Sequence, residues 1–286
     1  MHQTTRDIVG LQRLVRWPNL LIIFFTQYLV RIFLVGPSAQ WLSHLTDLRF
    51  FTYLVSVSCV VAGGYIINDY YDIKIDTVND PQKVVIGQRL RRRKALAAHL
   101  LFTLSGFFIS LLLNWKLAAI NLFAIFWLWL YSNQLKRMPF VGNFTVASLT
   151  ALVVFVVGIY FKSTNYLVYI FGFFAFYISL IREIIKDMET LRGDMHFGLK
   201  TLPVVWGIRK TKTVLYTILL AFIITTVPLL LLIGNPTLDI YFLCMLLPTA
   251  YFIFKLYWAD TRKEYQRLRY FCNLVMISGI GIITLL

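Results

Sequence analysis

A nine-residue stretch, NDYYDIKID, places an amide and three carboxylates in a chain that is otherwise dominated by apolar residues. Asn68, Asp72 and Asp76 recur every fourth residue, so they share one face of a helix with 3.6 residues per turn. Carboxylates one turn apart repel each other, and desolvation near a bilayer adds to that cost. The pattern therefore predicts a bound cation. Mg2+ is the natural candidate, because it prefers oxygen ligands and commonly bridges protein carboxylates to substrate phosphates.

A second acidic segment, KDMETLRGDMHFGLKTLP, occupies residues 186–203. Asp187 and Asp194 are seven residues apart, so they share a face if one helix extends through both. Gly193 argues against that extension, because glycine destabilises a helix interior. Two acidic clusters with Lys or Arg nearby suit two Mg2+ ions and a diphosphate, and aromatic rings can stabilise an allylic carbocation. A single Asp is more often a helix cap or a solvated loop residue.

The elements that must position these residues are membrane-spanning helices, since 59% of the 286 residues are hydrophobic and only 14% are charged. We predict an all-α polytopic membrane protein in which residues 1–286 form a single integral-membrane domain. Apolar runs of about 17 to 25 residues indicate nine transmembrane helices. These predicted spans are 17–35, 48–67, 95–113, 117–132, 140–161, 165–185, 212–233, 237–258 and 268–286.

The distribution of basic residues predicts the orientation in the membrane. If the amino terminus is cytoplasmic, 24 of the 28 Lys and Arg residues lie in or beside cytoplasmic loops. Both acidic segments then face the cytoplasm, and the carboxyl terminus lies on the opposite side. The formal net charge of +15 is explained by loops that face anionic lipid headgroups, without a nucleic acid partner. No protein partner is predicted.

Three motifs together resemble those of the UbiA superfamily of intramembrane prenyltransferases. NDYYDIKID resembles the first acidic signature, NxxxDxxxD, and residues 186–203 resemble the second. YSNQLKR, residues 131–137, resembles the Tyr and Lys segment between them. The order and membrane side of the motifs match the family, and the resemblance covers essentially the whole chain. It implies Mg2+-dependent transfer of a polyprenyl group from an allylic polyprenyl diphosphate to a lipophilic acceptor in the lipid bilayer.

The resemblance also implies roles for individual residues. The metal ligands would be Asn68, Asp72, Asp76, Asp187 and Asp194, with Asp69 in a common second position of the first signature. Catalysis would rest on Asp72, Asp76, Asp194 and Lys136, and the substrate diphosphate would contact Lys83, Arg89, Tyr131 and Lys136. Arg16 and Asn19, in RWPN, are either acceptor-pocket residues or a membrane anchor and helix start. His196 is either a ligand or acceptor base, or a solvated loop residue.

Three departures from the family pattern bear on the site. Thr190 stands where one form of the second signature has its first Asp, so metal binding there shifts to Asp187 or Glu189. The segment KVVIGQR, residues 83–89, lacks the two prolines usual in that loop. Tyr131 and Lys136 are separated by four residues rather than three, so they need not point the same way.

The acceptor has two candidates. The KDxExxxGD and GxKTLP elements of the second signature are most similar to the branch that acts on geranylgeranylglyceryl phosphate, an ether lipid. Prenylation of a naphthoate or benzoate precursor of a quinone uses the same metal chemistry and is the alternative. An ion-coupled transporter is the alternative from another class. Such a transporter carries ionisable residues near the bilayer midplane, whereas the predicted spans contain few.

Overall fold

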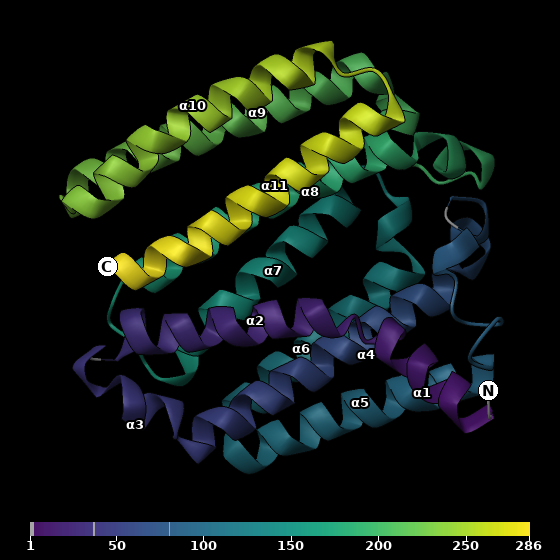
Figure 1. Ribbon diagram of the computed structural model, residues 1–286, viewed down its shortest axis with the longest axis horizontal. Helices are drawn as coiled ribbons and strands as arrows, with labels where there is room; N and C mark the ends of the chain where they lie inside the picture. Colours follow the sequence, from purple (N-terminus) through teal and green to yellow (C-terminus); the bar gives the residue numbers. More distant parts are fainter. Residues whose placement is uncertain (1–2, 37, 80) are drawn as a thin grey trace. The chain divides into compact units, whose positions relative to one another are not determined.

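The computed structural model describes residues 3–36, 38–79 and 81–286, and the regular elements in these ranges are helices (Figure 1). The longer helices are α1 (Gln3–Leu14), α2 (Trp17–Leu29), α4 (Leu48–Asn79), α5 (Arg92–Leu113), α6 (Trp115–Asn133), α7 (Val141–Tyr160), α8 (Leu167–His196), α9 (Leu202–Ile233), α10 (Pro236–Trp258) and α11 (Arg262–Ile282). The shorter ones are η1 (Val30–Val35), η2 (Ser38–Gln40), α3 (Trp41–Leu45), η3 (Pro81–Lys83), η4 (Leu135–Arg137) and η5 (Ile283–Leu285).

Nine helical segments within the described ranges are long and apolar enough to cross a membrane. This confirms the predicted all-α membrane protein. α4 and α8 continue beyond the predicted spans 48–67 and 165–185, to Asn79 and His196. Each acidic motif therefore lies on the continuation of a spanning helix rather than in a separate loop, which fixes the spacing of its side chains.

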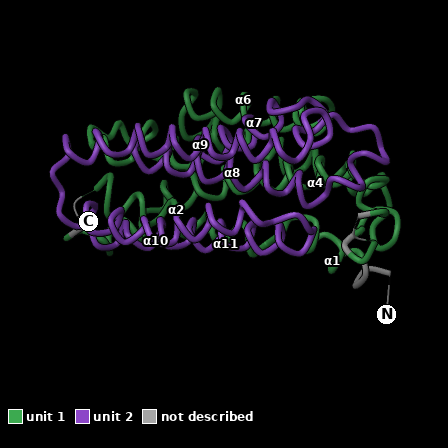
Figure 2. Tube along the Cα trace, turned by 90° about the horizontal axis from the view of Figure 1, so that it is seen from above, with its two compact units in different colours: residues 1–136, 153–168 green, residues 137–152, 169–286 purple. Residues whose placement is uncertain are grey.

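Contacts between Cα atoms divide the chain into two compact units, residues 1–136 with 153–168 and residues 137–152 with 169–286 (Figure 2). In the first unit, α4 packs extensively along α5 and also contacts α6. In the second unit, buried side chains of α8, α9, α10 and α11 form one apolar core. Ile184, Leu215, Leu256 and Tyr265 are among its fully or almost fully buried members.

Several helix starts follow from capping residues at short connections. Asn114 caps α6 by accepting a hydrogen bond from Lys116 N at 2.8 Å, and Asn235 caps α10 in the same way. α11 begins with a capping box between Thr261 and Glu264. The short Asn235 connection makes α9 and α10 an antiparallel pair, and Lys212 Nζ of α9 donates to Tyr257 O of α10 at 3.0 Å.

α4 and α5 approach each other closely at Gly106. A Cβ atom added there would lie 2.9 Å from Ser56 O and 2.8 Å from Val60 Cγ2. Ser56 Oγ donates to Gly106 O at 2.9 Å and accepts from Asn121 Nδ2 at 2.8 Å. A small residue and a buried polar link thus join α4, α5 and α6, as is common between membrane helices.

Replacing Gly106 with alanine should destabilise the protein, because the added methyl group collides with the backbone of α4. We expect a loss of about 1–3 kcal/mol in the free energy of unfolding. The measurement is the thermal melting temperature of the purified protein in detergent. Gly281→Ala is the matched control, since a Cβ atom there meets nothing within 4 Å. Equal melting temperatures for the two variants would contradict the close approach of α4 and α5.

Candidate active site

The first acidic motif occupies the last turns of α4. Asp72 forms an ion pair with Lys136, and these side chains are only 16% and 8% exposed. Asp69 accepts a hydrogen bond from Arg16 Nη2 at 2.6 Å. Asn68 Oδ1 is buried and has no hydrogen-bond partner within the described residues, while Asp76, one turn beyond Asp72, is half-buried. Asp69 and Asp72 of the motif therefore each pair with a basic side chain, and Asn68 presents a buried oxygen whose hydrogen-bonding capacity is unused.

Arg16 connects α1 to α2 and belongs with the first acidic motif. Its backbone is left-handed, with φ 51°, which is uncommon for a residue other than glycine. Its guanidinium pairs with Asp69 and lies 5.0 Å from the centre of the Tyr65 ring. Burial acts to lower the pKa of Arg16, but the charge of Asp69 opposes it and the pKa is raised. Asn19, by contrast, is exposed in the first turns of α2.

The predicted diphosphate-contacting residues have different surroundings. Tyr131 is half-buried near the end of α6, and Lys136 lies on η4 with its Nζ 5.9 Å from the centre of the Tyr71 ring. Arg89 is exposed, while the side chain of Lys83 lies outside the described part of the structure. Among these four, only Lys136 has a described ion pair with an acidic-motif residue.

The loop that includes Arg89 is anchored by apolar side chains instead of prolines. Val85 and Ile86 are buried with Leu14 and Ile66 in one apolar cluster. Arg89 N donates to Val85 O at 2.9 Å, which closes a tight turn. The backbone path that the missing prolines left open in the sequence is therefore set by burial of the valine and isoleucine side chains.

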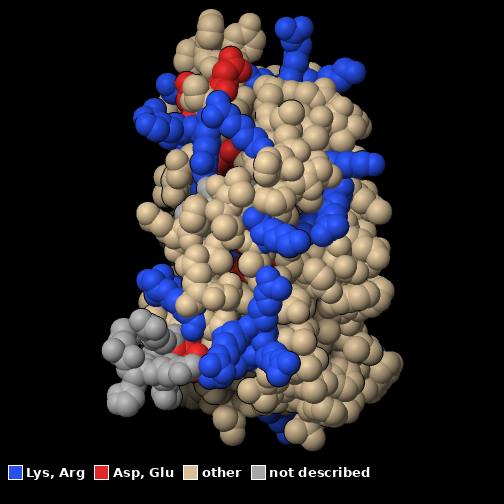
Figure 3. Space-filling view, turned by 90° about the vertical axis from the view of Figure 1, so that its right-hand side faces the viewer, with Lys and Arg blue, Asp and Glu red and all other residues tan. Residues whose placement is uncertain are grey.

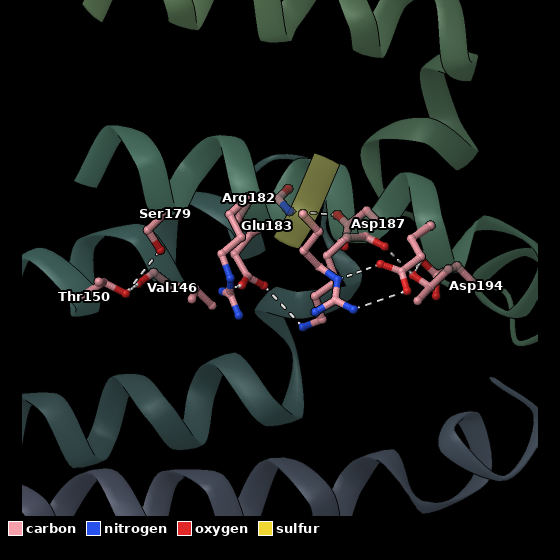
Figure 4. Close-up of polar contacts among 12 residues, drawn as sticks. Val146, Thr150, Ser179, Arg182, Glu183, Asp187 and Asp194 are labelled. Atoms are coloured by element: carbon pink, nitrogen blue, oxygen red, sulfur yellow. Dashed lines mark hydrogen bonds and ion pairs between the residues drawn. The ribbon is translucent and has the colours of Figure 1, made fainter. Parts of the chain in front are cut away.

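The second acidic motif lies on α8, which passes through Gly193 and ends at His196. Asp187 accepts a hydrogen bond from Asn143 Nδ2 at 2.7 Å (Figure 4). Asp194 is 4% exposed, and its Oδ2 accepts from both Thr190 Oγ1 and Thr201 Oγ1 at 3.2 Å. Thr190 thus supports Asp194 directly.

Two other candidate metal ligands in this segment have different surroundings. Glu189 accepts hydrogen bonds from Arg269 of α11 at 2.6 and 3.4 Å, so its carboxylate is engaged in a link between helices. His196 is exposed, and its ring meets Phe197 edge-on. Of the two carboxylates considered as the replacement at Thr190, Asp187 is the one that lacks a basic hydrogen-bond donor among its described contacts. We therefore favour Asp187 over Glu189 as a metal ligand.

α8 also carries ionisable residues that sequence reasoning passed over. Glu183 is 5% exposed within the spanning helix and pairs with Arg182 and Lys186. Its position four residues before Asp187 continues the spacing of the acidic face, and this was the available signal. Asn143, in contrast, is separated from Asp187 by 44 residues, and nothing in the sequence indicated that contact.

The residues of the two motifs fit Mg2+ in their donor chemistry. Carboxylate and amide oxygens are its preferred protein ligands, and the buried Asn68 Oδ1 is an oxygen donor with unused capacity. No three His, Cys, Asp or Glu side chains in the described ranges are grouped closely enough to hold a metal ion by themselves. Such a group is not required, because Mg2+ is usually bound by one or two carboxylates together with substrate phosphates and water.

Comparison with known proteins gives a consistent result. Residues 21–277 match the UbiA prenyltransferase family. Over 245 residues the chain is 34% identical to a digeranylgeranylglyceryl phosphate synthase of Saccharolobus solfataricus, covering 85% of this chain and 86% of that relative. A UbiA homologue of Archaeoglobus fulgidus, solved with DMAPP and Mg2+, superposes with a TM-score of 0.69 at 19% identity, covering 97% of this chain and 100% of the other.

A further solved structure, from work on digeranylgeranylglyceryl phosphate synthase in membranes, has a TM-score of 0.71 at 22% identity over 96% of both chains. A helical membrane fold with acidic motifs on two spanning helices defines an intramembrane enzyme of prenyl transfer. The chain belongs to the UbiA prenyltransferase family and is an integral membrane prenyltransferase. The family resemblance drawn from the three motifs is thereby confirmed.

Proposed function

We propose that this prenyltransferase transfers a geranylgeranyl group from geranylgeranyl diphosphate to geranylgeranylglyceryl phosphate. The observation that carries the choice of acceptor is the 34% identity to a digeranylgeranylglyceryl phosphate synthase over most of both chains. The second acidic motif supports it, since its KDxExxxGD and GxKTLP elements led to the same branch. The product would be digeranylgeranylglyceryl phosphate.

The reaction exchanges one bond to carbon for another. The bond between C1 of the allylic chain and the diphosphate oxygen breaks, and its electron pair leaves with the diphosphate. The acceptor hydroxyl oxygen then bonds to C1 and its proton is released, which gives an ether. Lys136, held by Asp72 beside the first motif, would donate to the leaving oxygens, assisted by Lys83, Arg89 and Tyr131. Preorganised charge of this kind is commonly the largest contribution to catalysis.

The proposed cofactor is Mg2+. Its proposed ligands on α4 are Asn68, Asp72 and Asp76, and its proposed ligands on α8 are Asp187 and Asp194. When bound, it would neutralise charge that develops on the diphosphate. Neutralisation matters here because the carboxylates alone would repel an anionic substrate. The donor set that supports this proposal consists of oxygens only, as Mg2+ requires.

We propose that both motifs face the cytoplasm, with the amino terminus on the same side and the carboxyl terminus opposite. The distribution of Lys and Arg along the sequence supports this orientation. Three exposed basic residues follow the first motif in the sequence, at the start of α5, namely Arg91, Arg92 and Arg93. In the space-filling view of Figure 3, Lys and Arg side chains cover more of the visible face than Asp and Glu do.

The acceptor is tested by offering candidates separately to the purified protein with geranylgeranyl diphosphate and Mg2+. We expect a product with geranylgeranylglyceryl phosphate, identified by its mass, and none when Mg2+ is removed with a chelator. Naphthoate and benzoate acceptors are the comparison arms. A prenylated aromatic product without any ether-lipid product would overturn the proposed acceptor while leaving the family assignment intact.

A further inference from the structure

Three charged residues within five positions of α8 form an ionic cluster inside the spanning helix. Arg182 donates to Glu183 Oε1, and Figure 4 shows these two residues on α8. Lys186 Nζ lies 3.3 Å from Glu183 Oε2. We call Arg182, Glu183 and Lys186 the α8 charge triad. None of the three has a role in the proposed metal site.

Stability alone does not account for the α8 charge triad. Taking ions out of water costs several kcal/mol each, and apolar residues at such positions are often as stable or more so. Ionisable residues within membrane spans are accordingly a sign of function. The triad also has two cations for one carboxylate. Asp187, the next residue, also interacts electrostatically with Lys186, but it is a proposed metal ligand. With Asp187 engaged by a metal ion, the triad would have one positive charge in excess of Glu183, which favours binding of an anion.

The exposure of the side chains shows which charges are accessible. The side chain of Glu183 is 6% exposed, whereas the side chains of Arg182 and Lys186 are 27% and 47% exposed. The carboxylate thus lies inside the cluster and holds one cation on each of its oxygens. The cations, and not the anion, form the surface that a bound molecule would meet.

A contact from α11 fixes the guanidinium of the triad. Arg182 Nε donates to Asn273 Oδ1 at 2.8 Å. Arginine has five N–H donors in a planar group, and the described residues use two of them, one on Asn273 and one on Glu183. A guanidinium oriented in this way is suited to a phosphate, which it binds through paired hydrogen bonds.

The position of the triad distinguishes its ligand from the donor diphosphate. Glu183 lies four residues before Asp187 on α8, about 6 Å along the helix axis and further into the span. The Asp187 carboxylate is directed to Asn143 instead. Glycerol has three adjacent carbons, so the phosphate of a glyceryl phosphate acceptor is necessarily close to its reacting hydroxyl. A second phosphate site one helical turn from Asp187, a proposed metal ligand, matches this arrangement.

We propose that the α8 charge triad binds the phosphate group of the acceptor, with Arg182 and Lys186 as its contacts and Glu183 as their positioning residue. The proposal rests on the proposed function, since it requires an acceptor with a phosphate monoester. Arg182 and Lys186 can both contact the oxygens of a phosphate monoester, whose charge is nearly −2 at neutral pH. The triad thereby selects phosphorylated lipids over neutral alcohols of the same chain.

The test compares geranylgeranylglyceryl phosphate with the same lipid lacking its phosphate. For Arg182→Gln and Lys186→Gln we expect the KM for the phosphorylated acceptor to rise on the order of ten- to a hundredfold, as for loss of a charged hydrogen bond. The kcat/KM for the unphosphorylated lipid should stay within about twofold of the parent, because that lipid cannot form the lost contact. The KM for geranylgeranyl diphosphate should also stay constant.

Two control variants separate charge recognition from folding. Lys186→Arg keeps the cation and should restore most of the preference for the phosphorylated acceptor. Lys212→Gln removes an equal charge from a lysine that pairs with Asp260 on the second unit, and should leave both acceptors unaffected. Melting temperatures of all variants are measured alongside the kinetics. A variant that melts normally and still uses the unphosphorylated lipid is folded.

Several outcomes would overturn the inference. An equal fall in kcat/KM for both acceptors would show that the triad supports the fold, and a raised KM for geranylgeranyl diphosphate would show that it binds the donor. A parent enzyme that uses the two lipids equally well would show that the phosphate of the acceptor is not recognised. Failure of the proposed function has a different signature, because the parent would then prenylate neither lipid and would act on an aromatic carboxylate instead.

Discussion

Replacing Asp72 with asparagine should lower the rate of prenyl transfer on the order of a thousandfold. Asparagine keeps the size of the side chain and an oxygen that can accept from Lys136, but it removes the negative charge. The site then loses both a charged metal ligand and the negative charge that pairs with Lys136, whose side chain is only 8% exposed. The measurement is the single-turnover rate with geranylgeranyl diphosphate and geranylgeranylglyceryl phosphate at saturating Mg2+.

Asp7→Asn is the matched control for this variant. Asp7 also pairs with a lysine, at 2.5 Å from Lys94 Nζ, but it lies on α1 outside the acidic motifs. Loss of an ion pair by itself should therefore leave turnover near the parent value. The double variant of Asp72→Asn with Lys136→Met also removes the buried cation whose charge Asp72 balances, so it should recover stability without recovering activity. Transfer at the parent rate by Asp72→Asn would refute the assignment of the first motif.

Replacing Asp194 with asparagine should also reduce turnover by on the order of a hundred- to a thousandfold. Its Oδ2 accepts from Thr190 and Thr201, and an asparagine oxygen can keep both hydrogen bonds. The fold should therefore persist while the charge is lost. A titration of activity with Mg2+ should show that the variant needs a higher concentration for half of its maximal rate.

Asp260→Asn provides the comparison in the same unit. Asp260 is 79% exposed and pairs with Lys212, so its substitution removes a negative charge that is not part of either motif. Its Mg2+ titration should overlay that of the parent. Identical titrations for Asp194→Asn and Asp260→Asn would show that Asp194 does not bind the metal.

The spacing of acidic residues predicted their helical placement better than hydropathy predicted the helix ends. Asn68, Asp72 and Asp76 lie on α4, as their four-residue period indicated. The predicted spans ended at 67 and 185 because an apolar window detects only the part of a helix that lies in hydrocarbon. The polar continuations of α4 and α8 have no such signal.

Gly193 and Gly198 illustrate how local chemistry and tertiary contacts share control of a helix end. Gly193 argues against an extended α8 in the sequence, but the helix continues, since the cost of a helical glycine is only about 1 kcal/mol and the hydrogen bonds to Asp194 follow it. The helix ends where Gly198 adopts a left-handed conformation, with φ 66°, and Leu199 N donates to Asp194 O at 2.9 Å.

Partners that are distant in sequence were not predictable from one chain. Arg16 was placed either in an acceptor pocket or at a membrane anchor, and its ion pair with Asp69, 53 residues away, was not foreseen. The same holds for Asn143 with Asp187 and for Asn273 with Arg182. Residue types indicated what the chemistry would be, whereas the fold determined which cation, amide or hydroxyl supports each carboxylate.

The central claim is that this protein joins a geranylgeranyl group to geranylgeranylglyceryl phosphate. Its most direct test measures diphosphate release and lipid product together, with purified protein, both substrates and Mg2+. We predict that digeranylgeranylglyceryl phosphate, identified by mass, and diphosphate form in equal amounts and that neither forms after chelation. Diphosphate release without the ether product, or no reaction between the two substrates, would contradict the claim.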